Sequence, residues 1–143
     1  MIKRYEVKEI VDIWSQENKL STWKKVESSV TKSLEEEGIV PKGLSEKILD
    51  ANVTVKEVEA REKVTNHDLA SFVDILQDKV NEDSEWIHYG LTSSDVVDTS
   101  NSLLILESLD FLIGEVDELI STCLLYTSPS PRDLQGSRMP SSA

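Results

Sequence analysis

Apolar residues recur at intervals of three and four positions through most of this chain, and this spacing restricts it to helical folds. The clearest case lies in residues 93–122, where Leu109, Leu112, Val116 and Leu119 alternate steps of three and four. Such spacing places the side chains on one helix face and is the seam pattern of a helical bundle. No useful stretch alternates with the period of two that strands require. An all-α fold is therefore predicted.

The same periodicity predicts six helices joined by short connections. Their approximate ranges are 10–14, 20–37, 45–52, 54–63, 65–80 and 93–122. Gly38 stands where a left-handed C-cap is expected, and Pro41 follows where the helix must stop. Thr65 is predicted to cap the helix over 65–80, with Asp68 as the acidic member of a capping box. The polar run at 81–85 is predicted to be a loop.

The charge balance argues against two classes of partner. The chain has 143 residues, with 27 acidic against 15 basic side chains and a net charge of −12. Nucleic acid and anionic membranes both repel such a surface, so neither is expected as a partner. A small anionic substrate remains compatible, because a few local donors outweigh the global field.

Several observations favour a cytoplasmic protein. No stretch approaches the ~20 apolar residues that a membrane span requires. The opening residues MIKRYEVKEI have no apolar run behind their basic residues, so a secretory signal is not expected. Cys123 is the single cysteine, which excludes an internal disulfide and gives no sign of an oxidising compartment.

Residues 123–143 differ in character from the rest of the chain. They contain closely spaced prolines and many serines without periodicity, a composition typical of disordered extensions. Back-translation gives a sharper interpretation, because 123–133 can be encoded by DNA that resembles a transposase-end sequencing adapter. Residues 137–143 can be encoded by the flow-cell end of the same adapter, and 134–136 fall where the sample index would lie. We interpret 123–143 as translated adapter.

The chain has two histidines, and both lie near predicted helix starts. His67 lies in the first turn of one helix, and His88 lies just before another. A helix start offers unpaired N–H groups and the positive end of the helix dipole, which suit phosphate or carboxylate. Thr92 and Ser93 add hydroxyl donors at the second start, and imidazole supplies a donor or moves a proton near neutral pH.

A structural interpretation of the same residues stays open. Ser, Thr and Asp at helix starts are commonly caps, and a histidine in a polar turn is commonly solvated. Two histidines without cysteine partners make a poor metal site, so no metal is predicted. The sequence has no phosphate-loop glycine pattern and no nucleophile elbow, and no cofactor is predicted.

The segment WIHYGLTSSDVVDT at 86–99 resembles the first signature block of adenylosuccinate lyases, in the fumarase/aspartase superfamily. TNHD at 65–68 resembles the segment that precedes this block, and MIKRY and ENKLSTW resemble the family's start. The likeness extends over nearly all of 1–122, and it implies that the chain is an N-terminal piece of such an enzyme. GSRMPSS at 136–142 also resembles the superfamily's mobile loop, but within translated adapter this likeness is accidental.

The resemblance implies a homotetramer built on a long-helix bundle, with active sites assembled from several subunits. Residues 1–92 would form the N-terminal helical domain, 93–122 the truncated start of the bundle, and 123–143 an artefactual, disordered tail. His67 would be the hydrogen-bonding or proton-handling group. The substrate-binding residues carried over from the family are Arg4, Tyr5, Asn66, His67, Asp68, His88, Thr92 and Ser93. Many family members have a basic residue where this chain has Asn66, which puts one ionic contact in doubt.

The implied reaction is a β-elimination that releases fumarate from adenylosuccinate, giving AMP, and from the succinyl-carboxamide ribotide of purine biosynthesis. The substrate would be a purine nucleotide bearing a succinyl group. The family's acid histidine and base serine lie in blocks that this chain does not reach, so the isolated chain is expected to be inactive. Two alternatives remain: another fumarate-releasing lyase such as argininosuccinate lyase, and a non-catalytic helical interaction module.

Overall fold

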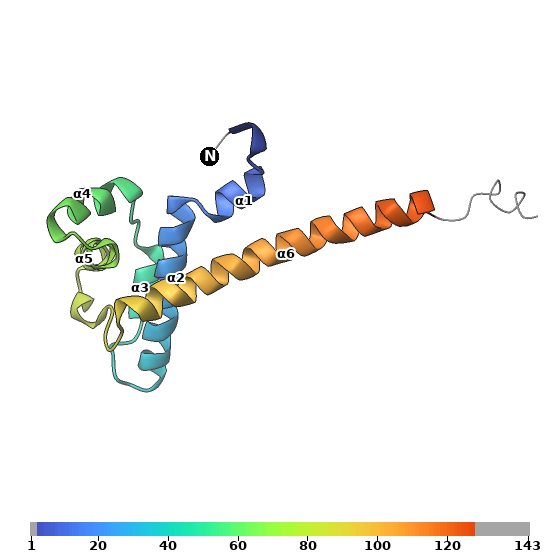
Figure 1. The fold of residues 1–143 in the computed structure, drawn as a ribbon. Coiled ribbons are helices and arrows are strands. Elements are labelled where there is room, and N and C mark those ends of the chain that lie inside the picture. Colours follow the sequence, from blue (N-terminus) through green and yellow to red (C-terminus); the bar gives the residue numbers. More distant parts are fainter. Residues whose placement is uncertain (1–2, 128–143) are drawn as a thin grey trace, which may run out of the picture. The chain divides into compact units, whose positions relative to one another are not determined.

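The computed structural model describes residues 3–127, and within this range every regular element is helical (Figure 1). The elements are η1 (Lys3–Tyr5), α1 (Lys8–Ile13), α2 (Gln16–Glu36), α3 (Leu44–Asp50), α4 (Val55–Thr65), α5 (Asp68–Val80), η2 (Ser84–Trp86) and α6 (Ser93–Thr127). The predicted all-α class is confirmed. None of the helices in the described range combines the length and the apolar composition that crossing a membrane demands.

Helix α2 begins and ends on local signals that the sequence displays. The Ser15 side chain accepts a hydrogen bond from the backbone N–H of Asn18 at 3.2 Å, which satisfies one donor of the first turn. At the other end Gly38 has φ of +72°, a conformation that side chains with a Cβ rarely adopt. The predicted left-handed glycine after this helix is therefore confirmed.

The core of the first unit lies between α2, α3, α4, α5 and the start of α6. Trp23 of α2 and Phe72 of α5 meet edge to face at its centre, with ring centroids 5.5 Å apart. Both side chains are almost wholly buried. The buried apolar cluster comprises Leu20, Trp23, Val26, Leu44, Ile48, Val58, Leu69, Phe72, Val73, Leu76, Ile87 and Val96. Burial of this cluster holds α5 and the α6 start against α2.

The junction between α4 and α5 differs from the prediction. Thr65 does not cap α5 but is the last residue of α4, and Asn66 follows in the left-handed region at φ of +53°. The cap of α5 is His67, whose side chain accepts from the N–H of Ala70. Asn66 takes the conformation that ends a helix, so α5 begins at Asp68, two residues later than a threonine cap at 65 would allow.

The chain divides into two compact units, and the division falls inside α6. The first unit ends at Ser108 and the second begins at Leu109. In the second unit α6 continues to Thr127, beyond the predicted end at Thr122. Residues 128–143, most of the predicted adapter tail, lie outside the described range. The predicted domain boundaries at 92 and 122 stay predictions.

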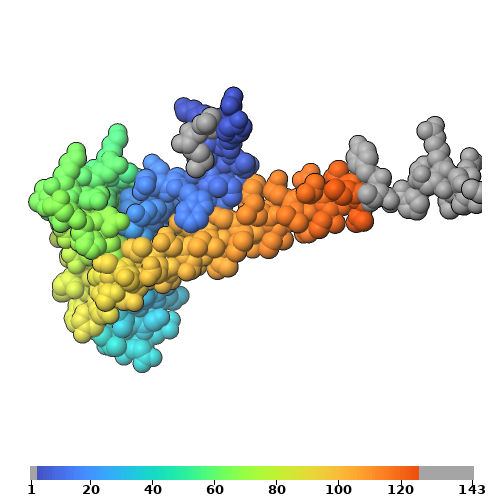
Figure 2. Space-filling view, viewed as in Figure 1, coloured from blue at the N-terminus to red at the C-terminus, as the bar shows by residue number. Residues whose placement is uncertain are grey.

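The described part of the second unit is a single helix with many exposed apolar side chains, drawn orange to red in Figure 2. They include the predicted seam residues at 109, 112, 116 and 119, and their full set is Leu109, Leu112, Ile113, Val116, Leu119, Ile120, Leu124 and Leu125. A helix with this much uncovered apolar surface gains most of its stability from packing against partners.

Candidate functional site

His67 and Ser93 bring two predicted helix starts together. Nε2 of His67 lies 3.3 Å from Oγ of Ser93, the first residue of α6. On the other side of the ring, Nδ1 accepts from the N–H of Ala70 at 3.3 Å. The His67 side chain is 48% exposed, so a ligand can reach it. The α5 and α6 starts, 26 positions apart, therefore share one side-chain contact.

The capping role of His67 determines its hydrogen-bonding state. A nitrogen that accepts from a backbone N–H carries no proton, so a neutral His67 ring has its proton on Nε2. This N–H donates to the Ser93 hydroxyl oxygen, the one side-chain partner of Nε2 within the described residues. His67 is thus positioned to donate a hydrogen bond at the α6 start, where an anionic group is favoured.

Asp68 is held by neighbours from two helices. Its carboxylate accepts from the N–H of Leu69 at 2.8 Å and from Nζ of Lys19 at 3.2 Å. Partial burial alone would raise the Asp68 pKa, but the Leu69 hydrogen bond and the Lys19 ammonium together hold this pKa below its ordinary value. Asp68 therefore stays ionised and is engaged with Lys19, a residue that the sequence prediction did not include.

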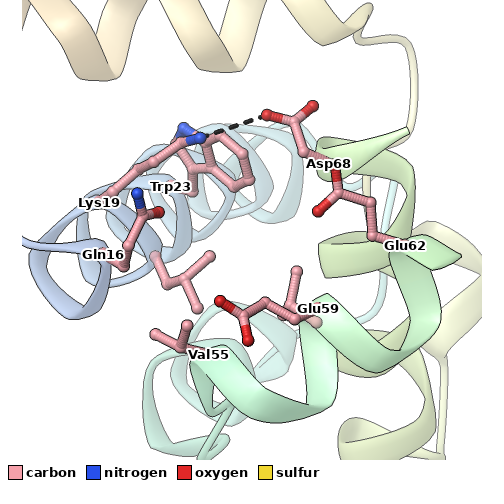
Figure 3. Close-up of a pocket in the computed structure, with 9 residues that line it drawn as sticks. Gln16, Lys19, Trp23, Val55, Glu59, Glu62 and Asp68 are labelled. Carbon is pink, nitrogen blue, oxygen red and sulfur yellow. Dashed lines mark hydrogen bonds and ion pairs between the residues drawn. The ribbon is translucent and has the colours of Figure 1, made fainter. Parts of the chain in front are cut away.

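Asp68 and Lys19 also line a pocket of about 240 Å³ between α2 and α4 (Figure 3). The Lys19–Asp68 ion pair forms one rim, and Glu59 and Glu62 of α4 face it. Nζ of Lys19 also lies 4.4 Å from the ring centroid of Trp23, a cation–π contact. Within residues 3–127 no group of three His, Cys, Asp or Glu side chains is arranged to hold a metal ion.

His88 pairs with a buried carboxylate that the sequence analysis missed. Nδ1 of His88 lies 2.6 Å from Oε1 of Glu27, in the middle of α2. The Glu27 side chain has no exposed area, and its Oε2 has no partner in the described structure. Burial raises the pKa of Glu27, and the hydrogen bond and charge of His88 partly offset that rise. The sequence does carry one signal of this buried carboxylate. Glu27 lies at a helical spacing from Leu20 and Trp23, at a position where an apolar residue is expected.

The hydrogen-bond donors of Thr92 are bound by Asp95, an acidic residue of the helix that Thr92 precedes. Its N–H and its hydroxyl both donate to Oδ2 of Asp95, at 2.7 and 3.2 Å. This is the structural arrangement that the sequence left open, an acidic side chain satisfying donors at a helix start. Binding of an anionic group by Thr92 stays a prediction and requires that Asp95 release these donors.

Arg4 and Tyr5 make their contacts away from His67, Asp68 and Ser93. The Arg4 guanidinium carbon is 4.8 Å from the Tyr5 ring centroid, and both side chains are exposed on η1. Tyr5 lines an apolar hollow with Ile10 and Trp14. Among residues 3–127 no hydrogen bond or ion pair joins Arg4 or Tyr5 to the other predicted site residues. The structure thus brings together His67, Asp68 and Ser93, with Asn66 beside them in the chain.

The chain is similar to three adenylosuccinate lyases. It is 41% identical to that of Thermotoga maritima over 119 residues, which are 82% of this chain and 28% of the relative. Identity is 39% over 124 residues for the Aquifex aeolicus enzyme and 34% over 122 residues for the Bacillus subtilis enzyme, each covering 84% of this chain and 28% of the relative. The chain thus spans about 28% of the length of these relatives.

A solved structure shares the fold. A fumarate lyase from Mesorhizobium sp. BNC1 superposes with a TM-score of 0.67 and 16% identity, covering 73% of this chain and 26% of that chain. At this identity the likeness shows the fold alone. No protein-family model matches the chain. The sequence relatives thus relate this chain to the N-terminal part of adenylosuccinate lyases, and the solved structure shows that it has the all-α fold of a fumarate lyase.

Proposed function

We propose that this chain supplies part of an active site that eliminates fumarate from adenylosuccinate and from the succinyl-carboxamide ribotide of purine biosynthesis. The observation that carries the proposal is the contact between His67 and Ser93. It joins the two segments whose sequence resembles the signature of adenylosuccinate lyases, and the relatives match over most of the chain. The conclusion is therefore a carbon–nitrogen lyase that works by β-elimination.

The geometry suits two tasks in this reaction. The Nε2–H group of His67 would donate a hydrogen bond to the substrate or pass a proton, since this donor reaches the α6 start. Ser93 and Thr92 would hold an anionic group of the substrate at the positive end of the α6 dipole. Arg4, Tyr5 and Asn66 would contact the nucleotide part. The principal acid and base would come from outside this chain, so the chain by itself would be inactive.

Self-association would complete the site. The second unit exposes apolar side chains along α6, which is the surface a helical bundle buries. We propose a homotetramer for the complete enzyme, located in the cytoplasm. This arrangement would also surround the half-exposed His67 with groups from other subunits and exclude water from the reacting atoms.

A chimeric enzyme tests the proposal. Residues 1–122 would replace the matching N-terminal part of the Thermotoga maritima lyase, and fumarate release from adenylosuccinate would be measured beside the isolated 143-residue chain. We expect activity from the chimera and none from the isolated chain. A chimera that assembles yet releases no fumarate from either purine substrate would contradict the proposal. Faster release from argininosuccinate would favour the other lyase instead.

The same chimera separates catalysis from structure at His67. His67→Asn retains a capping oxygen at the α5 start but has no titratable ring. Loss of general acid–base catalysis lowers kcat/KM by roughly 10² to 10⁴. We expect that decrease with the tetramer intact, as judged by gel filtration. Loss of assembly in this variant would instead favour a structural role for His67, as in the non-catalytic helical module.

A further inference from the structure

Glu27 occupies a position where a charged side chain is unexpected. It lies on the core face of α2, between Val26 at 7% and Ser28 at 5% exposure, and has no exposed area itself. A glutamate is rarely fully buried unless it is paired, because removing a carboxylate from water costs several kcal/mol. Its partner is His88, 61 positions away. Its second oxygen has no partner in the described structure, so core stability alone gives no reason for a carboxylate here.

The loop that carries His88 is fixed around this contact. His88 has φ of +66°, in the left-handed region that residues other than glycine seldom occupy. The rings of Trp86 and Tyr89, which flank His88 in the chain, pack edge to face against each other with centroids 5.1 Å apart, and Ile87 is buried. Backbone strain of this kind persists only where surrounding contacts hold it, and it concentrates at functional sites.

We propose that Glu27 is a positioning residue that orients His88 for substrate: it accepts a hydrogen bond from Nδ1–H and leaves Nε2 as the ring atom that accepts a hydrogen bond or a proton from the substrate. The 2.6 Å contact of Nδ1 with Oε1 directs the ring, since the partner of one nitrogen determines the state of the other. The His88 side chain is 22% exposed, so one edge of the ring remains accessible. This inference rests on the proposed function, because it assigns His88 to the substrate site.

The two histidines are therefore assigned opposite roles at Nδ1. In His67 that nitrogen accepts from the N–H of Ala70, whereas in His88 it donates to Glu27. In each ring a hydrogen bond at Nδ1 fixes the ring orientation and directs Nε2 away from that partner. Because the chain contains only these two histidines, each ring gives separate signals in a ¹⁵N spectrum, and His67 is an internal control.

The test is the imidazole ¹⁵N spectrum of the 143-residue chain near neutral pH, with Glu27→Leu and Glu27→Gln as variants. We expect a protonated Nδ1 in wild-type His88 and an unprotonated Nδ1 in His67. Glu27→Leu should shift His88 Nδ1 toward the unprotonated value. Glu27→Gln retains an oxygen acceptor of the same size and should keep it protonated. The His67 signals should not change in either variant.

A control variant on the same helix isolates the effect. Glu35 accepts from the N–H of Ser45 at 2.7 Å and has no contact with His88, so Glu35→Gln should leave both rings unchanged. An unprotonated Nδ1 in wild-type His88 would overturn the inference, whatever the variants do. So would a folded Glu27→Leu variant, with unchanged circular dichroism, whose His88 spectrum matches wild type. These readouts do not involve activity, so they stand or fall separately from the lyase proposal.

Discussion

The Glu27–His88 pair makes an asymmetric stability prediction. Removing one member of a buried ion pair strands the other and costs about 3–5 kcal/mol, whereas an apolar replacement of the buried charge is often neutral. Because His88 is 22% exposed, we take the lower end, about 3 kcal/mol, for His88→Ala. Glu27→Leu removes the desolvated carboxylate and should change stability by less than about 1 kcal/mol.

Thermal unfolding followed by circular dichroism checks this asymmetry. A loss of about 3 kcal/mol lowers Tm by roughly 10–20 °C in a unit of this size. We therefore expect a large decrease for His88→Ala and a small change for Glu27→Leu. In the double variant, His88→Ala should add little, because the stranded carboxylate is gone. Equal losses from the two single variants would refute the reasoning.

The Glu27–His88 pair also predicts how the loss of stability in His88→Ala depends on pH. Burial raises the folded-state pKa of Glu27 above its unfolded value of about 4.3. A raised carboxyl pKa contributes stability that is present below the unfolded pKa and is lost as pH rises through the folded pKa. His88→Ala removes the contacts that lower this pKa, so its loss of stability should shrink as pH falls towards the unfolded pKa of about 4.3 and grow as pH rises above it. Glu27→Leu/His88→Ala should show no such trend.

Three further predictions concern the helix starts. Replacing His67 by Ala removes the acceptor for Ala70 N–H and should cost about 1 kcal/mol in thermal unfolding, whereas His67→Asn should retain most of the stability. Thr54 forms a capping box with Glu57, so Thr54→Ala should lower stability by about 1 kcal/mol in urea unfolding and Thr54→Ser by much less. The hydrogen bond from Lys79 has the largest effect on the pKa of Glu57, and together with hydrogen bonds from Thr54 it lowers that pKa to about 2. The stability that this lowered pKa contributes is present above about pH 4.3 and is lost as pH falls towards about 2. In acid titration, Lys79→Met should therefore lose less stability than wild type over that interval. Equal losses would contradict the assignment of Lys79 as the main cause.

The sequence was sufficient for the helices because each depends on local spacing. Gly38, for example, lies within two positions of the end of α2, and its left-handed conformation was predicted from the sequence. The α4–α5 junction was mispredicted because Thr65, Asn66 and His67 all have side chains suited to a helix end. Only the conformation of Asn66, at φ of +53°, decides which of them caps α5.

The candidate site was predictable in part for a related reason. His67 and Ser93 were identified as two separate helix starts, but their contact depends on how the core packs α5 and α6 together. Glu27 was not identified, because a glutamate among apolar positions does not reveal a histidine partner 61 residues away. Pairings between distant residues are properties of the folded core and not of a local pattern.

The half-exposed His67 and the uncovered apolar side chains of α6 point to the same requirement. Elimination needs fixed donors in a site from which water is excluded, because donors act most strongly where the dielectric is low. His67 is 48% exposed, and the Thr92 donors are bound to Asp95, so these residues alone do not form such a site. The apolar residues of α6 require burial for a separate reason, the cost of hydrating them. Packing against further helices would meet both needs, and for this reason we propose that the activity resides in the assembled enzyme.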